Sequence, residues 1–217
     1  QIRFNGPKEM ITLLGEETDL KFIEKIRTLS LSPDIVQQYH DLKIVYTPIH
    51  GTGVKLVPMA LRAFGFTNII PVPEQEVVSG NFPTVISPNP EEPAAMELAI
   101  AKAREVDADL VLATDPDADR IGVVVKNNHG RYVIINGNQT ALLFIYYIIV
   151  KMKENGVMKG NEFVVKTIVS TELIAEIARK NQVKIFDVYT GFKYIAEVIR
   201  DNEGILKYIG GGEESFG

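Results

Sequence analysis

The sequence contains no cysteine, which excludes disulfide bonds and thiolate chemistry and is compatible with a cytoplasmic location. It also lacks an excess of basic residues, since 23 Lys and Arg face 28 Asp and Glu for a formal net charge of −5. That balance argues against a general nucleic-acid or membrane-surface binder. The longest apolar run, residues 141–150, is far shorter than the roughly 20 residues of a membrane span, so we expect a buried helix there.

An initiator methionine and a charged-then-apolar leader are absent as well. The chain begins Gln-Ile-Arg and stops inside a glycine-rich stretch, so we expect both ends to be cut from something longer. The 217 residues, 46% hydrophobic and 24% charged, suit a globular protein of one large or two small domains.

One stretch dominates the chain: a short apolar strand, Leu110–Thr114, followed by carboxylates at alternate positions and then by Arg120. The carboxylates are those of Asp115, Asp117 and Asp119. A straight strand would hold the outer two roughly 13 Å apart, so the segment must curl into a loop for all three to converge. Converging carboxylates repel one another unless a cation neutralises them, and hard oxygen ligands suit Mg²⁺. Arg120 would supply a planar fork for phosphate beside the metal.

Three other interpretations of this loop compete with a metal site. An EF-hand would need Gly at its sixth position and Glu at its twelfth, where Arg120 and Lys126 stand, so that interpretation fails. A phosphatase with an aspartyl nucleophile also begins with Asp-x-Asp after a hydrophobic strand, and it would use Asp115 as the nucleophile. A solvated acidic turn is the simplest alternative, but three Asp followed by Arg favour the metal site.

The remaining pattern alternates strands and helices, which predicts an α/β fold. Strands are expected at 42–46, 68–72, 110–114, 121–126, 131–135, 162–166, 183–188 and 205–209, and helices at 16–28, 53–64, 92–104, 141–150, 171–180 and 191–201. The proline-rich segment 73–93 is expected to be a loop. Asn127-Asn-His-Gly130 is typical of a hairpin turn, and we place a boundary between two small domains there, near residue 130.

Three further groups follow predicted strands. Lys166 puts a cation at a strand end, and Thr190-Gly-Phe-Lys193 opens a helix, whose free N–H groups attract anions. In Gly210-Gly-Gly-Glu-Glu-Ser-Phe-Gly217 the glycines permit close approach of a ligand. Glu213 and Ser215 in that segment are suited to bind vicinal sugar hydroxyls. Taken one at a time, ordinary surface lysines and a flexible loop explain these features equally well.

Together these motifs resemble the α-D-phosphohexomutase family, of the phosphoglucomutase/phosphomannomutase type. The matching segments are Asp115–Arg120, Thr190–Lys193, Gly212–Gly217, Thr47-Pro-Ile-His-Gly-Thr-Gly53, Ser79-Gly-Asn-Phe-Pro83 and Asn89-Pro-Glu91. The resemblance implies a four-domain parent of which this chain holds the second and third domains, each an αβα unit with a mixed sheet. Residues 31–129 would be the second domain, 130–217 the third, and 1–30 the lead-in from a missing first domain.

The resemblance also implies roles for the residues. Asp115, Asp117 and Asp119 would bind Mg²⁺, and Arg120 would hold phosphate. Glu213 and Ser215 would bind sugar hydroxyls of a glucose or mannose phosphate. Lys166 and Lys193 would line the cleft near phosphate or transfer protons. The general acid/base stays open, because some relatives carry His where Phe192 stands.

The parent would interconvert hexose 1-phosphate and hexose 6-phosphate through a phosphoserine and a bisphosphorylated sugar. The family's serine loop in the first domain and its phosphate-binding fourth domain do not occur in this sequence. We therefore expect the chain alone to be inactive. A non-catalytic module that binds sugar phosphates is the remaining alternative.

Overall fold

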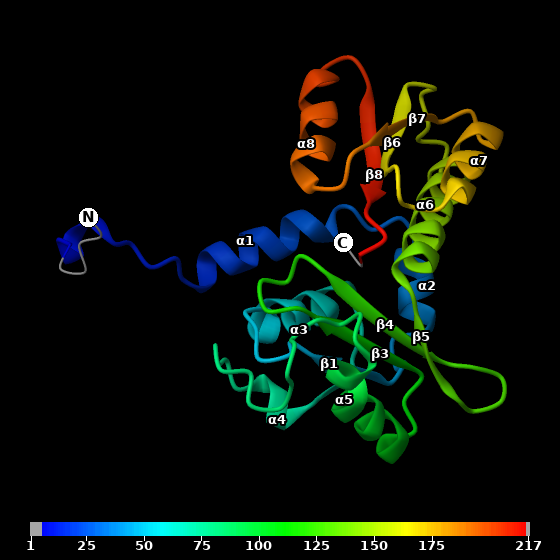
Figure 1. Cartoon of the computed structure of the whole chain (residues 1–217). Helices are drawn as coiled ribbons and strands as arrows, with labels where there is room; N and C mark the ends of the chain where they lie inside the picture. The colour runs from blue at the N-terminus through cyan, green and yellow to red at the C-terminus, as the bar shows by residue number, and fades with distance from the viewer. Residues whose placement is uncertain (1–5, 216–217) are drawn as a thin grey trace.

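In the computed structural model, which describes residues 6–215, the chain forms two αβα units, each built around its own sheet (Figure 1). The first sheet has the strand order β2-β1-β3-β4-β5. Its strands are β1 (Ile44–Thr47), β2 (Ile69–Pro71), β3 (Leu110–Thr114), β4 (Ile121–Lys126) and β5 (Tyr132–Ile135). β1 pairs in parallel with β2 and β3, whereas the β3–β4 and β4–β5 pairs are antiparallel. This sheet is mixed, as expected.

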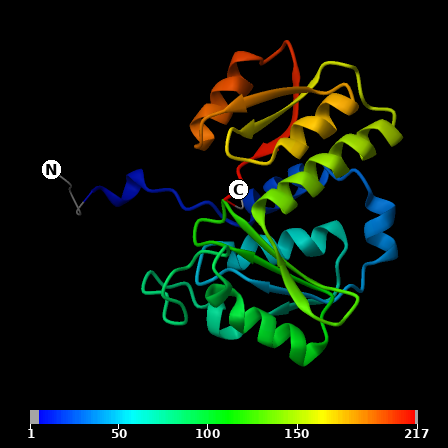
Figure 2. The same cartoon turned by 45° about the vertical axis from the view of Figure 1, so that its right-hand side comes forward.

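Helices cover both faces of the first sheet (Figures 1 and 2). The helices of this part of the chain are α1 (Glu16–Arg27), α2 (Pro33–Gln38), α3 (Gly53–Phe64), α4 (Pro73–Glu76) and α5 (Pro93–Val106). The 3-10 turn η1 (Lys8–Met10) precedes them and lies away from the sheet (Figure 1). The small residues of α5 pack on Val45, Val111 and Val124 to form the core of this unit. Alternate residues of the same strands face α3, where the Tyr46 hydroxyl contacts Thr114 Oγ1 at 2.9 Å.

The second sheet has the order β7-β6-β8, and all its pairs are parallel, so the expectation of a mixed sheet is wrong for this unit. Its strands are β6 (Glu162–Thr167), β7 (Lys184–Val188) and β8 (Lys207–Gly212), and its helices are α6 (Gly137–Glu154), α7 (Glu172–Lys180) and α8 (Phe192–Asp201). Val164 lies in a core cluster with residues of α6 and α7, whereas Phe163 and Val165 lie in a cluster with Ile195 of α8. The central strand is therefore buried on both faces, as parallel sheets require.

The expected boundary near residue 130 falls inside a hairpin whose two strands belong to one sheet. A division there would separate β5 from β4. The next element, α6, begins directly after Asn136, whose side chain accepts a hydrogen bond from the backbone N–H of Gln139 at 2.9 Å. The Gln139 side chain returns a bond to the Asn136 N–H at 3.0 Å, which completes a capping box. We therefore propose that the boundary lies at residue 136.

Segments before residue 40 contact both units. Lys55 of α3 pairs with Asp19 of α1 at 2.6 Å. Tyr147 of α6 donates to Ser32 Oγ at 2.9 Å, and Asn155 donates to the Leu31 carbonyl at 3.0 Å. The predicted buried helix at 141–150 is part of α6, which runs from Gly137 to Glu154. No helix within residues 6–215 is long and apolar enough to cross a membrane.

Candidate metal and sugar-phosphate site

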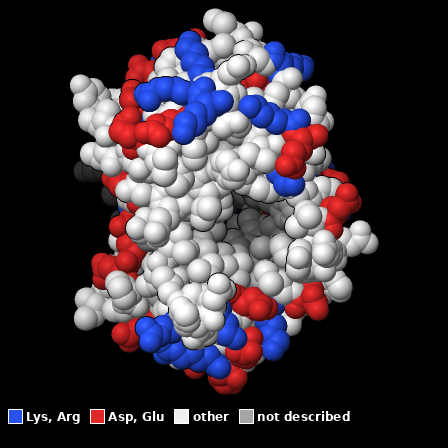
Figure 3. All heavy atoms as spheres, turned by 90° about the vertical axis from the view of Figure 1, so that its right-hand side faces the viewer, with Lys and Arg blue, Asp and Glu red and all other residues white. Residues whose placement is uncertain are grey.

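A cleft of about 430 Å³ lies where the two units meet. One wall comes from the loop between β3 and β4, and the other from the end of β8 at Gly210–Glu213. The first turns of α6 line its floor with small and apolar side chains, among them Gly137, Thr140 and Phe144. On the face drawn in Figure 3, a hollow lies between an upper and a lower lobe, and the charged side chains gather mainly on the lobes.

The aspartate loop curls as the sequence predicts. Each of Asp115, Asp117 and Asp119 offers a carboxylate oxygen, and these oxygens lie within 4.8 Å of one another. The curl depends on a turn in which the Ala118 N–H donates to the Asp115 carbonyl at 3.1 Å, with Ala118 at φ 62°. The Arg120 N–H then donates to Asp115 Oδ1 at 3.1 Å. The predicted convergence of the three carboxylates is confirmed.

The electrostatics of this loop fit a cation. Asp115 is buried, whereas Asp117 and Asp119 are exposed. Burial raises the pKa of Asp115 to about 6, and the neighbouring carboxylates add to the rise although the Arg120 N–H opposes it. Opposite ligands of one octahedral Mg²⁺ stand about 4 Å apart, close to the spread of these oxygens. The three residues therefore suit a hard divalent ion in both donor type and spacing.

The Arg120 side chain lies beside the carboxylates without forming a short hydrogen bond to any of them. Its guanidinium nitrogens lie 3.6 Å from Glu91, 3.9 Å from Asp115 and 3.9 Å from Asp119. These separations are longer than those of a charge-assisted hydrogen bond. The side chain also lines the cleft. Its N–H groups are thus available to an anion that enters there.

The turn Thr47–Gly53 holds the aspartate loop from behind. The Thr52 N–H and hydroxyl both donate to the Pro116 carbonyl, at 2.8 and 3.0 Å. Gly51 lies so close that a Cβ there would meet the Pro116 carbonyl oxygen at 2.6 Å. His50 is buried in this turn between the Val77 carbonyl and the Thr84 hydroxyl, each at 2.8 Å. The supporting role of Thr52 was missed by the sequence analysis, and the only signal for it was the paired glycines around it.

The glycine-rich segment brings Glu213 into the cleft wall opposite the aspartate loop. Its side chain is buried, and its Oε1 accepts a 2.5 Å hydrogen bond from the Gly191 N–H at the start of α8. The Ser215 hydroxyl lies 3.5 Å from its other oxygen. The predicted proximity of Glu213 and Ser215 is therefore present, although Phe216 and Gly217 of the same motif lie outside the described residues. The free N–H groups at the start of α8 were expected to attract an anion. For the Gly191 N–H that anion is the Glu213 carboxylate of the same chain.

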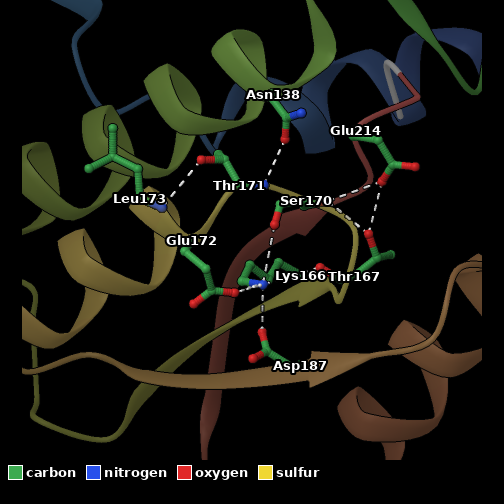
Figure 4. A network of polar contacts seen from close by, with 9 residues as sticks. All are labelled: Asn138, Lys166, Thr167, Ser170, Thr171, Glu172, Leu173, Asp187 and Glu214. Atoms are coloured by element: carbon green, nitrogen blue, oxygen red, sulfur yellow. Dashed lines mark hydrogen bonds and ion pairs between the residues drawn. The ribbon is translucent and has the colours of Figure 1, made fainter.

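Lys166 does not lie in the cleft, contrary to the sequence-based prediction. Its side chain is 1% exposed, and its Nζ pairs with Glu172 at 2.8 Å and Asp187 at 3.0 Å (Figure 4). Burial by itself would lower the pKa of Lys166, but the two carboxylates outweigh it and raise the pKa above its ordinary value. Such a lysine stays protonated and is poorly suited to transfer a proton.

Lys193 lies on the exposed side of the first turn of α8. Its Nζ sits 4.8 Å from the centroid of the Tyr194 ring, and it borders a shallow depression with Glu197 and Arg200. It is absent from the described residues that line the cleft between the two units. Its assignment to phosphate binding or proton transfer stays a prediction.

Comparison with known proteins places this architecture in a family. Residues 21–130 match the model of phosphoglucomutase/phosphomannomutase, alpha/beta/alpha domain II, and residues 136–217 match that of domain III. The chain belongs to the phosphoglucomutase/phosphomannomutase family. The resemblance stated from the sequence is confirmed.

Curated members of the phosphoglucomutase/phosphomannomutase family are similar along most of the chain. A phosphoglucomutase of Staphylococcus haemolyticus is 38% identical over 188 residues, which are 87% of this chain and 33% of that protein. A phosphoglucomutase of Staphylococcus aureus strain N315 is 38% identical over 177 residues, or 82% of this chain and 31% of that protein. The chain thus spans about a third of the length of these relatives.

Solved structures share the fold at lower identity. A phosphoglucomutase/phosphomannomutase family protein from Burkholderia thailandensis superposes with a TM-score of 0.64 at 23% identity, covering 85% of this chain and 38% of that one. The N-acetylphosphoglucosamine mutase of Aspergillus fumigatus, solved with GlcNAc-6P and magnesium, gives a TM-score of 0.63 at 17% identity over 93% of this chain and 40% of that one. At these identities the likeness supports the fold alone.

Proposed function

We propose that this chain supplies the metal-binding and sugar-recognising residues of a phosphohexomutase that interconverts hexose 1-phosphate and hexose 6-phosphate. One observation carries the proposal: three carboxylates converge in a loop that forms one wall of a cleft, where Asp119 is among the lining residues, and the opposite wall presents Glu213. Family membership and the curated phosphoglucomutases support the same reaction class. A cytoplasmic location and a glucose or mannose phosphate as the substrate belong to this proposal.

In the proposed site the residues divide the work between metal, phosphate and sugar. Asp115, Asp117 and Asp119 would hold Mg²⁺, which when bound supplies positive charge that stabilises the transferring phosphoryl group. Arg120 would donate its free N–H groups to phosphate oxygens at the same wall. Glu213 would accept hydrogen bonds from sugar hydroxyls, with Ser215 beside it. Because hydroxyls are presented by either orientation of the sugar, one such carboxylate serves both half-reactions.

The phosphoserine donor and a second phosphate-binding region would come from domains I and IV of a longer protein. This part of the proposal is supported by the relatives, of which the chain covers about a third. The chain by itself is then expected to bind the divalent ion but not to turn over hexose phosphate.

The first test is metal binding by the 217-residue chain, measured with Mn²⁺ by electron paramagnetic resonance and with Mg²⁺ by calorimetry. Replacing one of three carboxylate ligands, Asp117→Asn, should weaken binding by about tenfold or more, as loss of a charged ligand does. The matched control is Asp41→Asn, which also removes one exposed carboxylate but lies away from the cleft. Equal affinity for the chain and its Asp117→Asn variant would contradict the metal assignment.

A second test separates the alternative functions. The chain is incubated with acetyl phosphate and Mg²⁺ and analysed by mass spectrometry. A covalent phosphate on Asp115 would favour the aspartyl-nucleophile phosphatase, whereas the mutase proposal predicts none. Mutase activity of the longer protein, lost on removal of its serine nucleophile, would exclude a purely binding module.

A further inference from the structure

The segment after β8 is attached to the second unit by two adjacent carboxylates that point to different partners. Glu213 accepts from the Gly191 N–H in the loop after β7. Glu214 accepts from the hydroxyl of Thr167, the last residue of β6, at 3.0 Å and from the hydroxyl of Ser170, in the turn that follows, at 3.2 Å (Figure 4). Because the three strands are parallel, their carboxyl ends lie at one edge of the sheet. The two carboxylates thus connect all three strand ends.

The turn that receives Glu214 is itself held firmly. Lys166 donates to the carbonyls of Thr167 and Ser170, at 3.2 and 3.4 Å, at opposite ends of the turn. The Thr167 and Ser170 hydroxyls lie 2.8 Å apart, and both residues are buried. From the other side, Asn138 of α6 accepts from the Thr171 N–H at 2.7 Å. The conformation of the turn is therefore fixed from both sides, and Lys166 joins its two ends through the carbonyls of Thr167 and Ser170.

Glu214 connects this fixed turn to the backbone of the segment after β8. Hydrogen bonds to an ionised acceptor are stronger than neutral ones, and two donors on one carboxylate fix its orientation. Glu214 is absent from the described residues that line the cleft, while its neighbour Glu213 is among them. A single peptide bond joins the residue with the fixed side chain, Glu214, to the one that faces the cleft, Glu213.

We propose that Glu214 is a positioning residue, whose contacts with Thr167 and Ser170 hold the backbone so that Glu213 faces the sugar. The inference rests on the proposed function only in taking the ligand that Glu213 faces to be a sugar, since the placement of Glu213 can be measured without activity. Glu214 takes no part in binding metal or in proton transfer. Lys166, Thr167 and Ser170 support it from the sheet edge.

The kinetic test uses the longer protein that carries this chain, assayed from glucose 1-phosphate to glucose 6-phosphate. Glu214→Ala should raise KM about tenfold with little change in kcat, because a misplaced Glu213 weakens ground-state and transition-state binding alike. Glu214→Gln keeps an oxygen that accepts from both hydroxyls and should recover KM to within about twofold. The control is Glu203→Ala, an exposed glutamate of the same unit whose side chain has no polar partner within residues 6–215.

The structural test uses the 217-residue chain and follows the Gly191 amide by nuclear magnetic resonance. In Glu214→Ala this amide should exchange its hydrogen about tenfold faster, because the hydrogen bond from the Gly191 N–H to Glu213 is no longer held in place. Glu203→Ala should leave the exchange rate unchanged. If Glu214→Ala does not fold, Thr167→Val, which removes one of the two donors, should give a smaller increase in the same direction.

The two tests fail in different ways. Absence of mutase activity in the unaltered longer protein would overturn the proposed function, and the Gly191 exchange rate would still decide the positioning role. A folded Glu214→Ala chain with an unchanged Gly191 exchange rate would overturn the positioning role. So would a Glu214→Ala enzyme whose KM matches that of the unaltered protein.

Discussion

At the scale of single residues, the site depends on backbone atoms that approach unusually closely. Gly51 faces the Pro116 backbone with no room for a side chain. Thr52 binds the Pro116 carbonyl twice, which fixes the start of the aspartate loop. The spacing of the three carboxylates is therefore set by a turn some sixty residues earlier in the chain, as well as by the loop's own sequence.

This close approach makes Gly51→Ala a sharp test. The new Cβ would meet Pro116 backbone atoms that cannot rotate away, so the loop must shift. We expect a loss of about 1–3 kcal/mol in the free energy of unfolding, typical of overpacking, together with weaker Mn²⁺ binding. Urea unfolding and Mn²⁺ titration measure the two effects. Gly80→Ala is the control, because a Cβ there meets nothing within 4 Å; matching behaviour of the two variants would contradict the contact.

At the scale of elements, β6 organises the second unit, and polar groups mark both its ends. At its start, Glu162 is buried and accepts from the N–H groups of Lys159 at 2.7 Å and Gly160 at 2.9 Å. At its end, Lys166 clamps the turn that leads into α7. Between them, the side chains of successive residues point to opposite faces of the sheet and pack in two separate cores. A buried central strand thus carries its charged residues only where partners exist.

Glu162 predicts a pH dependence of stability. Burial alone would raise the pKa of Glu162, but the N–H groups of Lys159, Glu162 itself and Gly160, together with the charge of Lys207, outweigh it and leave the pKa below the ordinary 4.5. A carboxyl whose pKa is lower in the folded state stabilises the protein above pH 4.5, and this contribution is lost as the pH falls through the folded value. Glu162→Gln should therefore be less stable than the unaltered chain at pH 7, by about 1–3 kcal/mol.

The measurement is urea unfolding of both proteins between pH 7 and pH 3. The difference in stability should narrow as the pH falls below 4.5. Glu203→Gln, at an exposed position, provides the control for a change of charge alone. A difference that stays constant over the whole range would show that Glu162 does not act through its ionised form.

At the scale of the whole molecule, the cleft exists only because the two units are held against each other. Its lining comes from α3 and the aspartate loop on one side and from α6 and β8 on the other. α6 starts beside the first sheet and packs in the core of the second. The bonds of Tyr147 and Asn155 to residues 31 and 32 anchor the far part of this helix. A ligand in the cleft would contact both units at once.

Metal binding should therefore stabilise the chain as a linked equilibrium. An ion that binds the folded state at about 100 times its dissociation constant adds about 2.7 kcal/mol to the free energy of unfolding. We expect Tm to rise as Mg²⁺ is added, with NaCl of equal ionic strength as the control. Asp117→Asn should show a much smaller rise. A Tm that responds identically to Mg²⁺ and NaCl would count against a specific site.

The sequence by itself determined the elements and the local shape of the metal loop. Hydrophobic periodicity and Gly/Pro punctuation depend on near neighbours, so the strand at 110–114 and the helix ending before Gly65 were predicted correctly. The convergence of Asp115 and Asp119 is local to the extent that only three residues lie between them, although the distant turn at Gly51 and Thr52 also fixes their loop. Repulsion among their carboxylates could be deduced without coordinates.

Only the tertiary structure decided which distant segments meet. It paired β1 with β3 in the first sheet, made the second sheet wholly parallel, and gave Lys166 its partner Asp187 on the neighbouring strand. It also joined Glu213 to Gly191 and Glu214 to Thr167, across more than twenty and more than forty residues respectively. Such contacts are chosen by the packing of whole faces against one another, and no residue's near neighbours in the chain encode them.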